Sequence, residues 1–442
     1  MPTGGGLLQL VAQGKQDIYL TGNPQMSFFK MVYRRHTNFA TESMPMYFDG
    51  EPNWGQTINC LIPRRGDLLS KVYLRVTVPQ LTQVGTNNLV SYCNSIGHAL
   101  IEEVKIQIGE QDIDKQTGEW MEIWSQLTTP TGQLDAYDEM IGRLDNYMPP
   151  NLIPSQDGRI LYIPLQFWFC RNPGLALPLL ALQYNPIRII IKLAPLQKMF
   201  WTGDLISDPC APQVQVNPVK LTNCMLWGDF VYLDNEERRV FVKNSQEYLI
   251  EQVQYTNTID APPTQNIVTA PIEFNNPIKE FIFVVQRNVM QQYHEYFNYS
   301  SLAINELFDI SANTPLANSL APGQTRTDLI SDAVLQLDGY NRFEARDPMY
   351  FRLLQPYEHH TNTPFNSYIY CYSFALQPEN IQPSGSMNAS RLNNILWQIT
   401  MNNTLNASGG NFNRGTCGIR IYAINHNIFR TQDGFGGLLF KI

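Results

Sequence analysis

The chain has 442 residues, of which 43% are hydrophobic and 12% aromatic, so it can bury a sizeable core and has no compositional sign of disorder. Charged residues make up only 16%, against about 25% in an average soluble protein, and this weakly ionised surface favours large protein contacts. The net charge of −8 argues against a protein that coats nucleic acid, since neutralising phosphates needs a surplus of Lys and Arg.

The cysteines and the lengths of the apolar runs indicate the cellular compartment of the protein. The seven cysteines form an odd set without a pair two residues apart, which predicts neither a disulfide framework nor a zinc knuckle and favours a reducing compartment. No run of about 18 apolar residues is present, which argues against a membrane-spanning helix. The start Met-Pro-Thr-Gly-Gly-Gly lacks the basic region and apolar core of a secretory signal, so we expect a cytosolic product.

The first 30 residues are predicted to form an arm with a short helix. They begin with glycines, are rich in apolar side chains and precede the first predicted strand. Asn23 followed by Pro24 supplies a cap and a first helical residue. Phe28 and Met31 follow at helical spacing, so a helix is expected to open at Asn23.

Two further helices are predicted. A helix from Glu119 carries an apolar stripe on one face, which we interpret as core packing rather than as a cofactor site. The stripe consists of Trp120, Ile123, Trp124 and Leu127. Asp234 with Glu237 three residues later is an Asp version of the capping box and predicts a helix over 235–241.

Strand-like runs dominate the chain. They are rich in β-branched and aromatic residues, and clusters of Gly, Pro, Asn and Asp separate them. The predicted strands are 71–78, 104–108, 159–169, 187–193, 226–233, 249–255, 279–286, 333–337, 368–376, 395–400 and 419–424. The long connections 111–158 and 288–332 are expected to be outer-facing or intermolecular surfaces.

The chain also resembles itself at an offset near 209 residues. The aligned anchors are 39–46 with 248–255, 69–76 with 278–285, 106–109 with 335–339, and 167–169 with 374–376. Their offsets are 209, 209, 229 and 207, so an insertion in the second half is nearly undone by the next anchor. Because all anchors keep their order, tandem duplication explains them better than a chance likeness of apolar strands.

These observations predict an all-β protein of two tandem eight-stranded jelly-roll β-sandwiches with a few short helices and long loops. The expected division is an N-terminal arm and short helix in 1–30, a first jelly roll in 31–230 and a second in 231–442.

Motifs for catalysis or cofactor binding are missing from the sequence. His294-Glu295 begins like a zinc motif, but Asn298 stands where the second histidine is needed. Glu358, His359 and His360 form the densest titratable cluster, which we interpret as a hydrogen-bonded polar loop rather than an acid–base or metal site. We expect no enzymatic activity, no cofactor, and no catalytic, cofactor-binding or metal-binding residues.

Four Asn-x-Ser/Thr sequons are present. Without a signal peptide they are most simply chance in an Asn-rich chain, and the sequence does not decide whether they carry glycans. They lie at Asn298, Asn388, Asn402 and Asn406.

Long strings of the sequence resemble the major capsid proteins of nucleocytoplasmic large DNA viruses. They are LLQLVAQGKQDIYLTGNPQMSFFKMVYRRHTNFATES (7–43), IQIGEQDID (106–114), LYIPLQFWFCRNPGLALPLLALQY (161–184), YLDNEERRVF (232–241), EYLIEQVQ (247–254), LQPYEHHTNTP (354–364), YSFALQPENIQPSGSMNASRLNN (372–394) and IYAINHNIFRTQDGFGGLLF (421–440). They cover nearly the whole chain. Departures are small: Glu110 sits where the family often has a second Gly, and His426 where an aromatic residue is common.

The resemblance implies a structural major capsid protein with two jelly rolls per chain. It also implies homotrimeric, pseudo-hexagonal capsomers that tile an icosahedral shell, usually over an internal membrane. The implied partners are further copies of the chain, neighbouring capsomers, minor capsid and penton proteins and possibly that membrane, with no direct nucleic acid. The implied location is the virion, after synthesis and assembly in the host cytoplasm.

Two alternatives remain open at this point. One is a jelly-roll carbohydrate-binding protein or hydrolase, because this fold also serves lectins and does not fix a function. The other is a related viral scaffold or minor capsid protein. Within the capsid hypothesis, residues 1–30 are expected to act as an arm beneath the capsomer.

Overall fold

The computed structural model describes residues 4–82, 90–144, 155–202, 219–303, 308–309, 314–315, 326–402 and 415–440. The chain divides into two compact units, Met1–Asn38 and Phe39–Ile442. The second unit holds both sheet sandwiches.

The N-terminal unit contains two short helices, α1 (Gly5–Val11) and α2 (Ile18–Thr21), neither of which buries a residue. The helix predicted to open at Asn23 is wrong: Asn23 has a positive φ of 50°, and residues 24–38 are not helical. The spacing of Phe28 and Met31 suits a helix, but these side chains are 88% and 94% exposed. An apolar stripe that packs on nothing cannot stabilise so short a helix.

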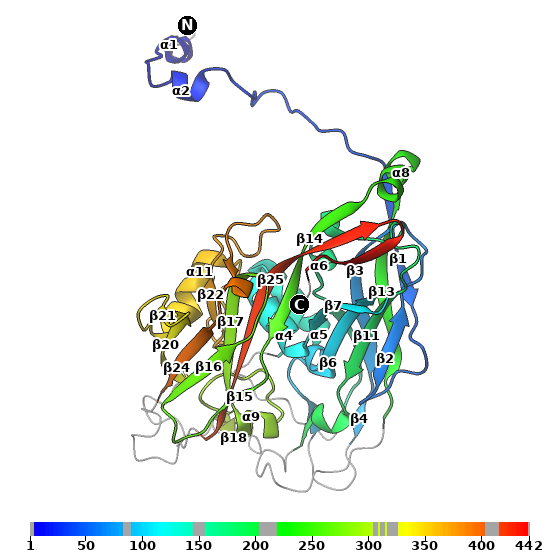
Figure 1. Ribbon diagram of the computed structural model, residues 1–442, viewed down its shortest axis with the longest axis vertical. Coiled ribbons are helices and arrows are strands. Elements are labelled where there is room, and N and C mark those ends of the chain that lie inside the picture. Colours follow the sequence, from blue (N-terminus) through cyan, green and yellow to red (C-terminus); the bar gives the residue numbers. More distant parts are fainter. Residues whose placement is uncertain are drawn as a thin grey trace. The chain divides into compact units, whose positions relative to one another are not determined.

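The first sandwich is built from two antiparallel sheets (Figure 1). One sheet has the order β1 (Phe39–Met46), β13 (Thr222–Leu233), β3 (Leu68–Val78), with β9 (Arg159–Pro164) and β10 (Leu177–Pro178) also paired to β3. The other has the order β2 (Thr57–Leu61), β11 (Ile187–Leu193), β6 (Ile101–Ile108), β7 (Gln111–Gln116). Alternate residues of β11 are buried between the sheets, as period-2 patterning requires.

The second sandwich repeats this strand order. Its first sheet has the order β14 (Gln246–Tyr255), β25 (Cys417–Gln432), β17 (Pro277–Arg287), β22 (Tyr370–Ser373), with β15 (Ile259–Ala261) and β26 (Phe435–Leu438) on β25 and β23 (Met387–Asn388) on β17. Its second sheet has the order β16 (Ile267–Ile272), β24 (Ile395–Met401), β20 (Ile330–Leu337), β21 (Tyr340–Asn341). In the described residues each sandwich thus supplies eight principal strands, which confirms the predicted pair of jelly rolls.

Strand register confirms the internal duplication. In the first sandwich, Ile189 of β11 lies between Cys60 of β2 and Ile106 of β6. In the second, Trp397 of β24 lies between β16 and β20 in the same way, and 208 residues separate it from Ile189. Each of these residues is completely buried. The duplicated positions therefore form the centres of two separate cores.

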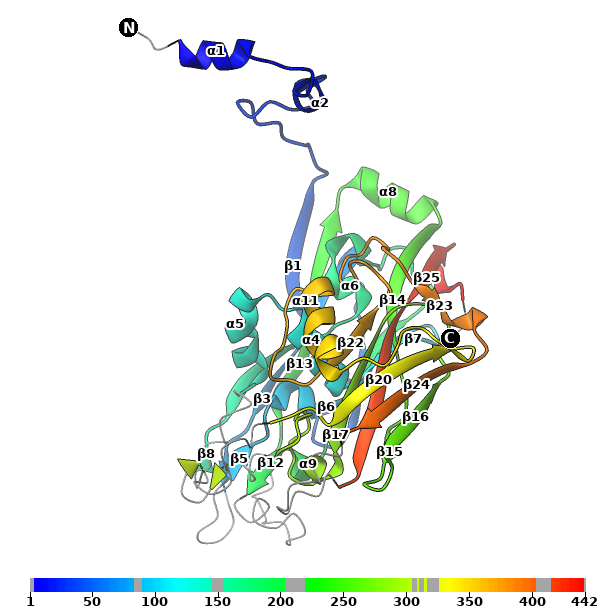
Figure 2. The same ribbon diagram turned by 90° about the vertical axis from the view of Figure 1, so that its left-hand side faces the viewer.

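Short helices and strand pairs connect the main strands (Figure 2). The helices are α3 (Ile96–Leu100), α4 (Gly118–Thr128), α5 (Thr131–Ile141), α6 (Trp168–Arg171), α8 (Asn235–Lys243), α9 (Asn288–Gln292), α11 (Gln355–His359), the 3-10 turns η1 (Pro173–Leu175), η2 (Leu196–Lys198) and η4 (Ala389–Arg391), and the π turn η3 (Tyr350–Leu354). The strand pairs are β4 (Leu81–Thr82) with β8 (Ser155–Gln156), β5 (Val90–Tyr92) with β12 (Phe200–Thr202), and β18 (Phe308–Asp309) with β19 (Thr314–Pro315).

Two predicted helices are confirmed. Helix α8 follows Asp234, whose Oδ1 accepts a hydrogen bond from the Asn235 N–H at 2.7 Å, and it continues to Lys243. Helix α4 carries the predicted stripe, in which Trp120, Ile123 and Leu127 are fully buried and Trp124 is 4% exposed. The interpretation as core packing is therefore confirmed.

Other predictions were wrong in part. The strand predicted over 159–169 ends at Pro164, and Trp168–Arg171 form helix α6 instead. The connection 111–158 contains β7, α4 and α5 rather than an outer-facing loop, and much of it is buried. Residues 293–303, which belong to the second long connection, are likewise mostly buried, so only the parts outside the described residues keep that expectation.

Candidate functional site at the seam between the sandwiches

Helix α4 belongs to the first sandwich but packs against the second. It begins after Thr117, whose Oγ1 accepts a hydrogen bond from the Trp120 N–H at 3.1 Å. It lies on the outer face of the sheet formed by β14, β25, β17 and β22 (Figure 1). We call this contact between α4 and that outer sheet face the seam.

The centre of the seam is apolar. The Trp120 ring lies 5.5 Å from the rings of both Trp124 and Tyr422. The residues of the second sandwich that take part include Val253, Ile282, Val284, Ile369, Cys371, Tyr422 and Ile424, each no more than 8% exposed. Burying one large apolar side chain contributes about 1.5–3 kcal/mol, so the stripe of α4 holds the two sandwiches together strongly.

A buried ion pair joins the start of α4 to strand β25. The Arg420 guanidinium donates to Glu119 Oε1 at 2.6 Å, and both side chains are at most 15% exposed. The hydroxyls of Tyr299 and Tyr422 also donate to the Glu119 carboxylate. Burial would lower the pKa of Arg420, but Glu119 raises it above its ordinary value, so the guanidinium stays charged.

A second ion pair crosses the seam from helix α6. Arg171 donates to Glu251 Oε2 of β14 at 2.7 Å, and its guanidinium lies 4.4 Å from the centre of the Trp124 ring. Lys279 of β17, 1% exposed, contacts the other oxygen of Glu251. The carboxylate of Glu251 therefore neutralises one cation from each sandwich.

Strand β7 supplies polar contacts to β14. The Val253 N–H donates to Asp114 Oδ1 at 3.2 Å, and the Gln252 amide donates to the Ile113 carbonyl. Burial raises the pKa of Asp114 to about 6, although the hydrogen bonds from Val253 and Gln116 lower it. The first sandwich thus contacts the edge strand of the second through backbone and side-chain polar groups.

Beneath α4, Glu122 is the centre of a buried charged cluster. Its carboxylate contacts His98 Nδ1 at 2.6 Å and Arg143 Nε at 2.8 Å. Burial alone would raise the pKa of Glu122, but Arg143 and His98 hold it well below the usual range. Burial lowers the pKa of His98 despite Glu122. The cluster fixes α4 to α3 and to the end of α5.

The sequence cluster at Glu358, His359 and His360 lies at the end of α11. His360 is buried between two carboxylates: its Nε2 lies 2.9 Å from Glu280 and its Nδ1 3.0 Å from Glu379. Burial would lower the pKa of His360, but Glu280 raises it well above the usual value. This histidine is therefore part of a structural ion cluster. The predicted polar loop is wrong in part, because Glu358 and His359 belong to helix α11.

The remaining sequence candidates lie apart from one another. His294 Nδ1 lies 2.8 Å from the Phe200 carbonyl, and Asn298 is half-buried and donates to Glu295. Asn402 is half-buried, Asn388 is exposed, and Asn406 lies outside the described residues. In the part of the chain that the structure describes, no three His, Cys, Asp or Glu side chains are grouped to hold a metal ion.

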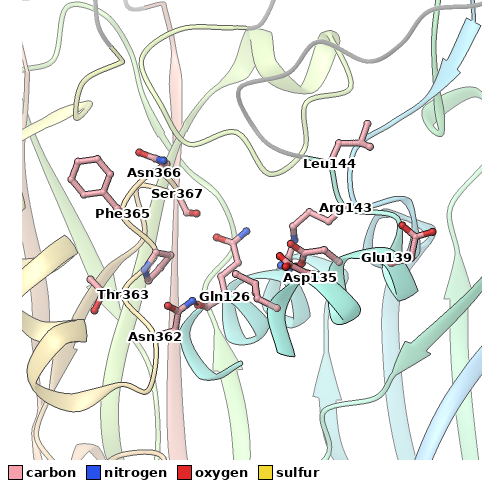
Figure 3. A pocket seen from close by; sticks show the side chains of 13 residues that line it. Gln126, Asp135, Glu139, Arg143, Leu144, Asn362, Thr363, Phe365, Asn366 and Ser367 are labelled. Carbon is pink, nitrogen blue, oxygen red and sulfur yellow. Dashed lines mark hydrogen bonds and ion pairs between the residues drawn. The ribbon is translucent and has the colours of Figure 1, made fainter. Parts of the chain in front are cut away.

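A cavity of about 550 Å³ lies at one side of the seam, between α4–α5 and residues 362–367 (Figure 3). The Asn362 N–H donates to the Leu127 carbonyl at 2.9 Å, and its side-chain amide donates to the Gln126 carbonyl at 2.9 Å. Arg143 at the cavity wall is already paired with Asp138 and Glu122. These polar groups bind the two sandwiches to each other, and we assign no catalysis to them.

The seam residues Glu119, Arg171 and Arg420 were missed by the sequence analysis. The only local signal for these residues was the apolar stripe of α4. Such a stripe predicts that the helix packs against something, but it does not identify the surface. Arg420 is 301 residues from Glu119, so no sequence spacing connects them. Within the described residues, no helix has the length and apolar character needed to cross a bilayer.

Comparison with known proteins gives a consistent result. A family model described as "Major capsid protein N-terminus" matches residues 27–234, and one described as "Large eukaryotic DNA virus major capsid protein" matches residues 237–437. The chain is 37% identical to the major capsid protein of Pyramimonas orientalis virus, over 99% of this chain and 100% of the relative. It is 34% identical to that of Paramecium bursaria Chlorella virus 1, over 99% of each.

Solved structures agree in fold. The capsid protein in a quasi-atomic model of the PBCV-1 virus capsid matches with a TM-score of 0.76 and 28% identity, over 94% of this chain and all of that chain. The Faustovirus major capsid protein matches with a TM-score of 0.73 over 94% of each chain, and at 13% identity it supports the fold alone.

Removing the charge of Glu119 should destabilise the chain, because Arg420 is left buried without a counter-ion. We expect Glu119→Gln to lower the free energy of unfolding by about 3–5 kcal/mol, measured by urea denaturation. The matched control is Glu247→Gln, since the Glu247–Arg430 pair is about half exposed on both sides and should contribute below about 1 kcal/mol. Equal effects of the two substitutions would contradict the assignment.

The buried carboxyl of Asp114 should make stability depend on pH. Because its folded-state pKa of about 6 lies above the ordinary 3.8, the folded chain binds more protons between these values, and stability falls as pH rises through that window. The isosteric Asp114→Asn removes the charge and keeps the side-chain oxygen that accepts from the Val253 N–H. Gln116 now donates to Asp114 through Nε2, and its Oε1, which lacks a hydrogen-bond partner among the described residues, can accept from the new amide once the Gln116 amide turns over.

We expect Asp114→Asn to raise the free energy of unfolding at pH 8 by on the order of 3 kcal/mol and to lose most of this gain at pH 4. Urea denaturation at the two pH values measures both numbers. A gain of the same size at both pH values would show that the charge of Asp114 is not its cause.

Proposed function

The chain belongs to the major capsid protein family of large eukaryotic DNA viruses, and on that premise we propose that three copies form a capsomer that tiles an icosahedral shell. The chain is a structural component of a viral capsid. Three chains with two like sandwiches each place six similar blocks around one axis. Such a ring closes through heterologous contacts and has a nearly hexagonal outline.

The observation that carries this proposal is the repeated strand order, held by the seam. Both sandwiches have the same two sheets in the same sequence of strands. The apolar stripe of α4 and the buried pair Glu119–Arg420 fix one sandwich against the other. A subunit that tiles a lattice needs a fixed angle between its blocks, and a large apolar contact with buried ion pairs supplies one.

Three further inferences complete the proposal. The division into an arm at 1–30, a first jelly roll at 31–230 and a second at 231–442 is kept, with the second boundary moved past Leu233, where β13 ends. The shell assembles in the host cytoplasm, with minor capsid and penton proteins as partners. The chain has no catalytic role, since the titratable side chains that cluster in the described residues form structural ion pairs with one another.

The arm is proposed to act beneath the capsomer. Residues 1–38 carry four basic side chains and one acidic one, which leaves a net charge of +3, while the remainder of the chain carries −11. Its apolar side chains are exposed, among them Leu8 at 69%, Phe29 at 99% and Val32 at 78%. An apolar, basic segment of this kind suits an acidic protein surface or a membrane beneath the shell.

The purified protein should sediment as a particle of three chains. A single chain has a mass of 50.6 kDa, and analytical ultracentrifugation together with negative-stain images measures the size and the triangular or hexagonal outline. A monomer or a dimer at all concentrations would overturn the proposed capsomer.

Deleting residues 1–30 should leave the trimers intact and impair their assembly into shells, because the arm is proposed to act below the capsomer. Sedimentation reports the trimers and electron microscopy the shells. A second variant, with Lys30, Arg34 and Arg35 changed to Gln, separates the charge of the arm from its apolar surface. Loss of trimers on deletion would show that the arm assignment is wrong.

A further inference from the structure

The two sandwiches present the same sheet face, but in the part of the chain that the structure describes only one of these faces is covered. In the first sandwich, Tyr73 of β3 pairs with Trp227 of β13. In the second, Ile282 of β17 pairs with Tyr422 of β25. Ile282 follows Tyr73 by 209 residues, which is the offset of the duplication. The seam face of the second sandwich therefore has a direct counterpart on the first.

This counterpart, the outer face of β13, β3 and β9, is aromatic and open in the single chain. Tyr73 and Trp227 are only half-buried and stack with 6.5 Å between ring centres. Tyr162 and Ile160 of β9 are 38% and 49% exposed. Ile282 and Tyr422, at the equivalent places of the seam, are 0% and 2% exposed because α4 covers them.

The element that corresponds to α4 also has no cover among the described residues. Helix α4 lies in the connection between β7 and β9, and the equivalent connection of the second sandwich, between β21 and β22, carries η3 and α11. One side of this helical segment packs inward through Phe351 and Gln355. The other side is apolar and open, with Met349, Leu354 and Tyr357 at 58%, 44% and 78% exposure.

We propose that η3–α11 of one copy covers the outer face of β13, β3 and β9 of the next copy, as α4 covers the seam within one chain. The partner is a second copy of this chain, because only the chain itself offers a helix in the place equivalent to α4. Each copy presents one such helix and one such face, so the contact is heterologous and repeats around a ring. The inference rests on the proposed trimer and adds the surfaces that form it.

Charge supports this docking. The open face carries Lys71 and Arg75 beside its aromatic side chains, and Asp229 of β13 lies opposite Lys71 in the register, so the face keeps a net positive charge among these three residues. The open side of the helix ends at Glu358, which is 50% exposed. In the seam the same combination occurs, where Glu119 of the helix meets Arg420 of the sheet. Opposite charges at the rim of an apolar contact fix its register and exclude wrong pairings.

The test uses two single substitutions in the full chain. Tyr162→Glu places a negative charge on the face, opposite the helix that carries Glu358. Tyr357→Arg places a positive charge on the helix, opposite Lys71 and Arg75. Each should convert particles of three chains into single chains in sedimentation at micromolar concentration. Both tyrosines are exposed, so circular dichroism should stay unchanged.

A combined variant and a control make the test specific. Tyr162→Glu with Tyr357→Arg in the same chain brings the new charges together at every contact, so trimers should return. Tyr340→Arg, at an 81% exposed tyrosine of β21, should leave trimers intact.

The outcomes separate the two proposals. If the unmodified protein is not a trimer, the proposed capsomer fails and this inference with it. If the unmodified protein is a trimer and both single variants stay trimeric, the capsomer stands, this contact is wrong, and the face has another occupant such as the arm or a neighbouring capsomer. If the single variants dissociate but the combined variant does not recover, the helix does not meet this face.

Discussion

Burial of the apolar side of α4 against the second sandwich is the contact on which the arrangement of the chain depends. A helix that leaves one sandwich and covers the sheet of another joins the two cores, and Ile250 and Phe429 of the second sandwich add to this contact by packing into the core of the first. The charged groups around the helix fix its orientation. Glu119 joins the start of the helix to β25, and Glu122 joins its middle to α3 and α5. Apolar area supplies most of the free energy, and the ion pairs select one relative orientation.

Duplication has left two sandwiches alike in topology and different in what covers them. Strand β17 is buried on both faces, whereas its counterpart β3 buries one face and leaves Tyr73 half-open. The inner faces are constrained by packing within each sandwich, so Ile189 and Trp397 fill equivalent central positions. The outer faces are constrained by whatever packs against them. One outer face contacts α4 of the same chain and the other does not, so the side chains on the two outer faces differ.

The sequence analysis succeeded where local periodicity decides the structure. The predicted strand 187–193 has the bounds of β11, because its alternating apolar residues face one core. Strand β7 was missed, because its buried residues Asp114 and Gln116 are polar: Gln116 donates to Asp114 and to the Gln166 carbonyl, and Asp114 also accepts from Val253 of the other sandwich. The helix expected at Asn23 failed for the reverse reason, since its periodicity is right but its apolar side packs on nothing. The ion pair of Glu119 with Arg420 joins residues 301 positions apart, and no local pattern encodes such a pair.

Each sandwich pairs its first strand with a long strand near its C-terminal end, β1 with β13 and β14 with β25. During synthesis the first sandwich is therefore complete soon after residue 233, while the tryptophans of α4 wait for β25, about 300 residues further along. At roughly 5–20 residues per second, this leaves them uncovered on the ribosome for on the order of 15–60 s. The nascent chain thus exposes an aromatic surface during the second half of its translation. Its folding yield depends on whether these tryptophan rings avoid aggregation until β25 is synthesised.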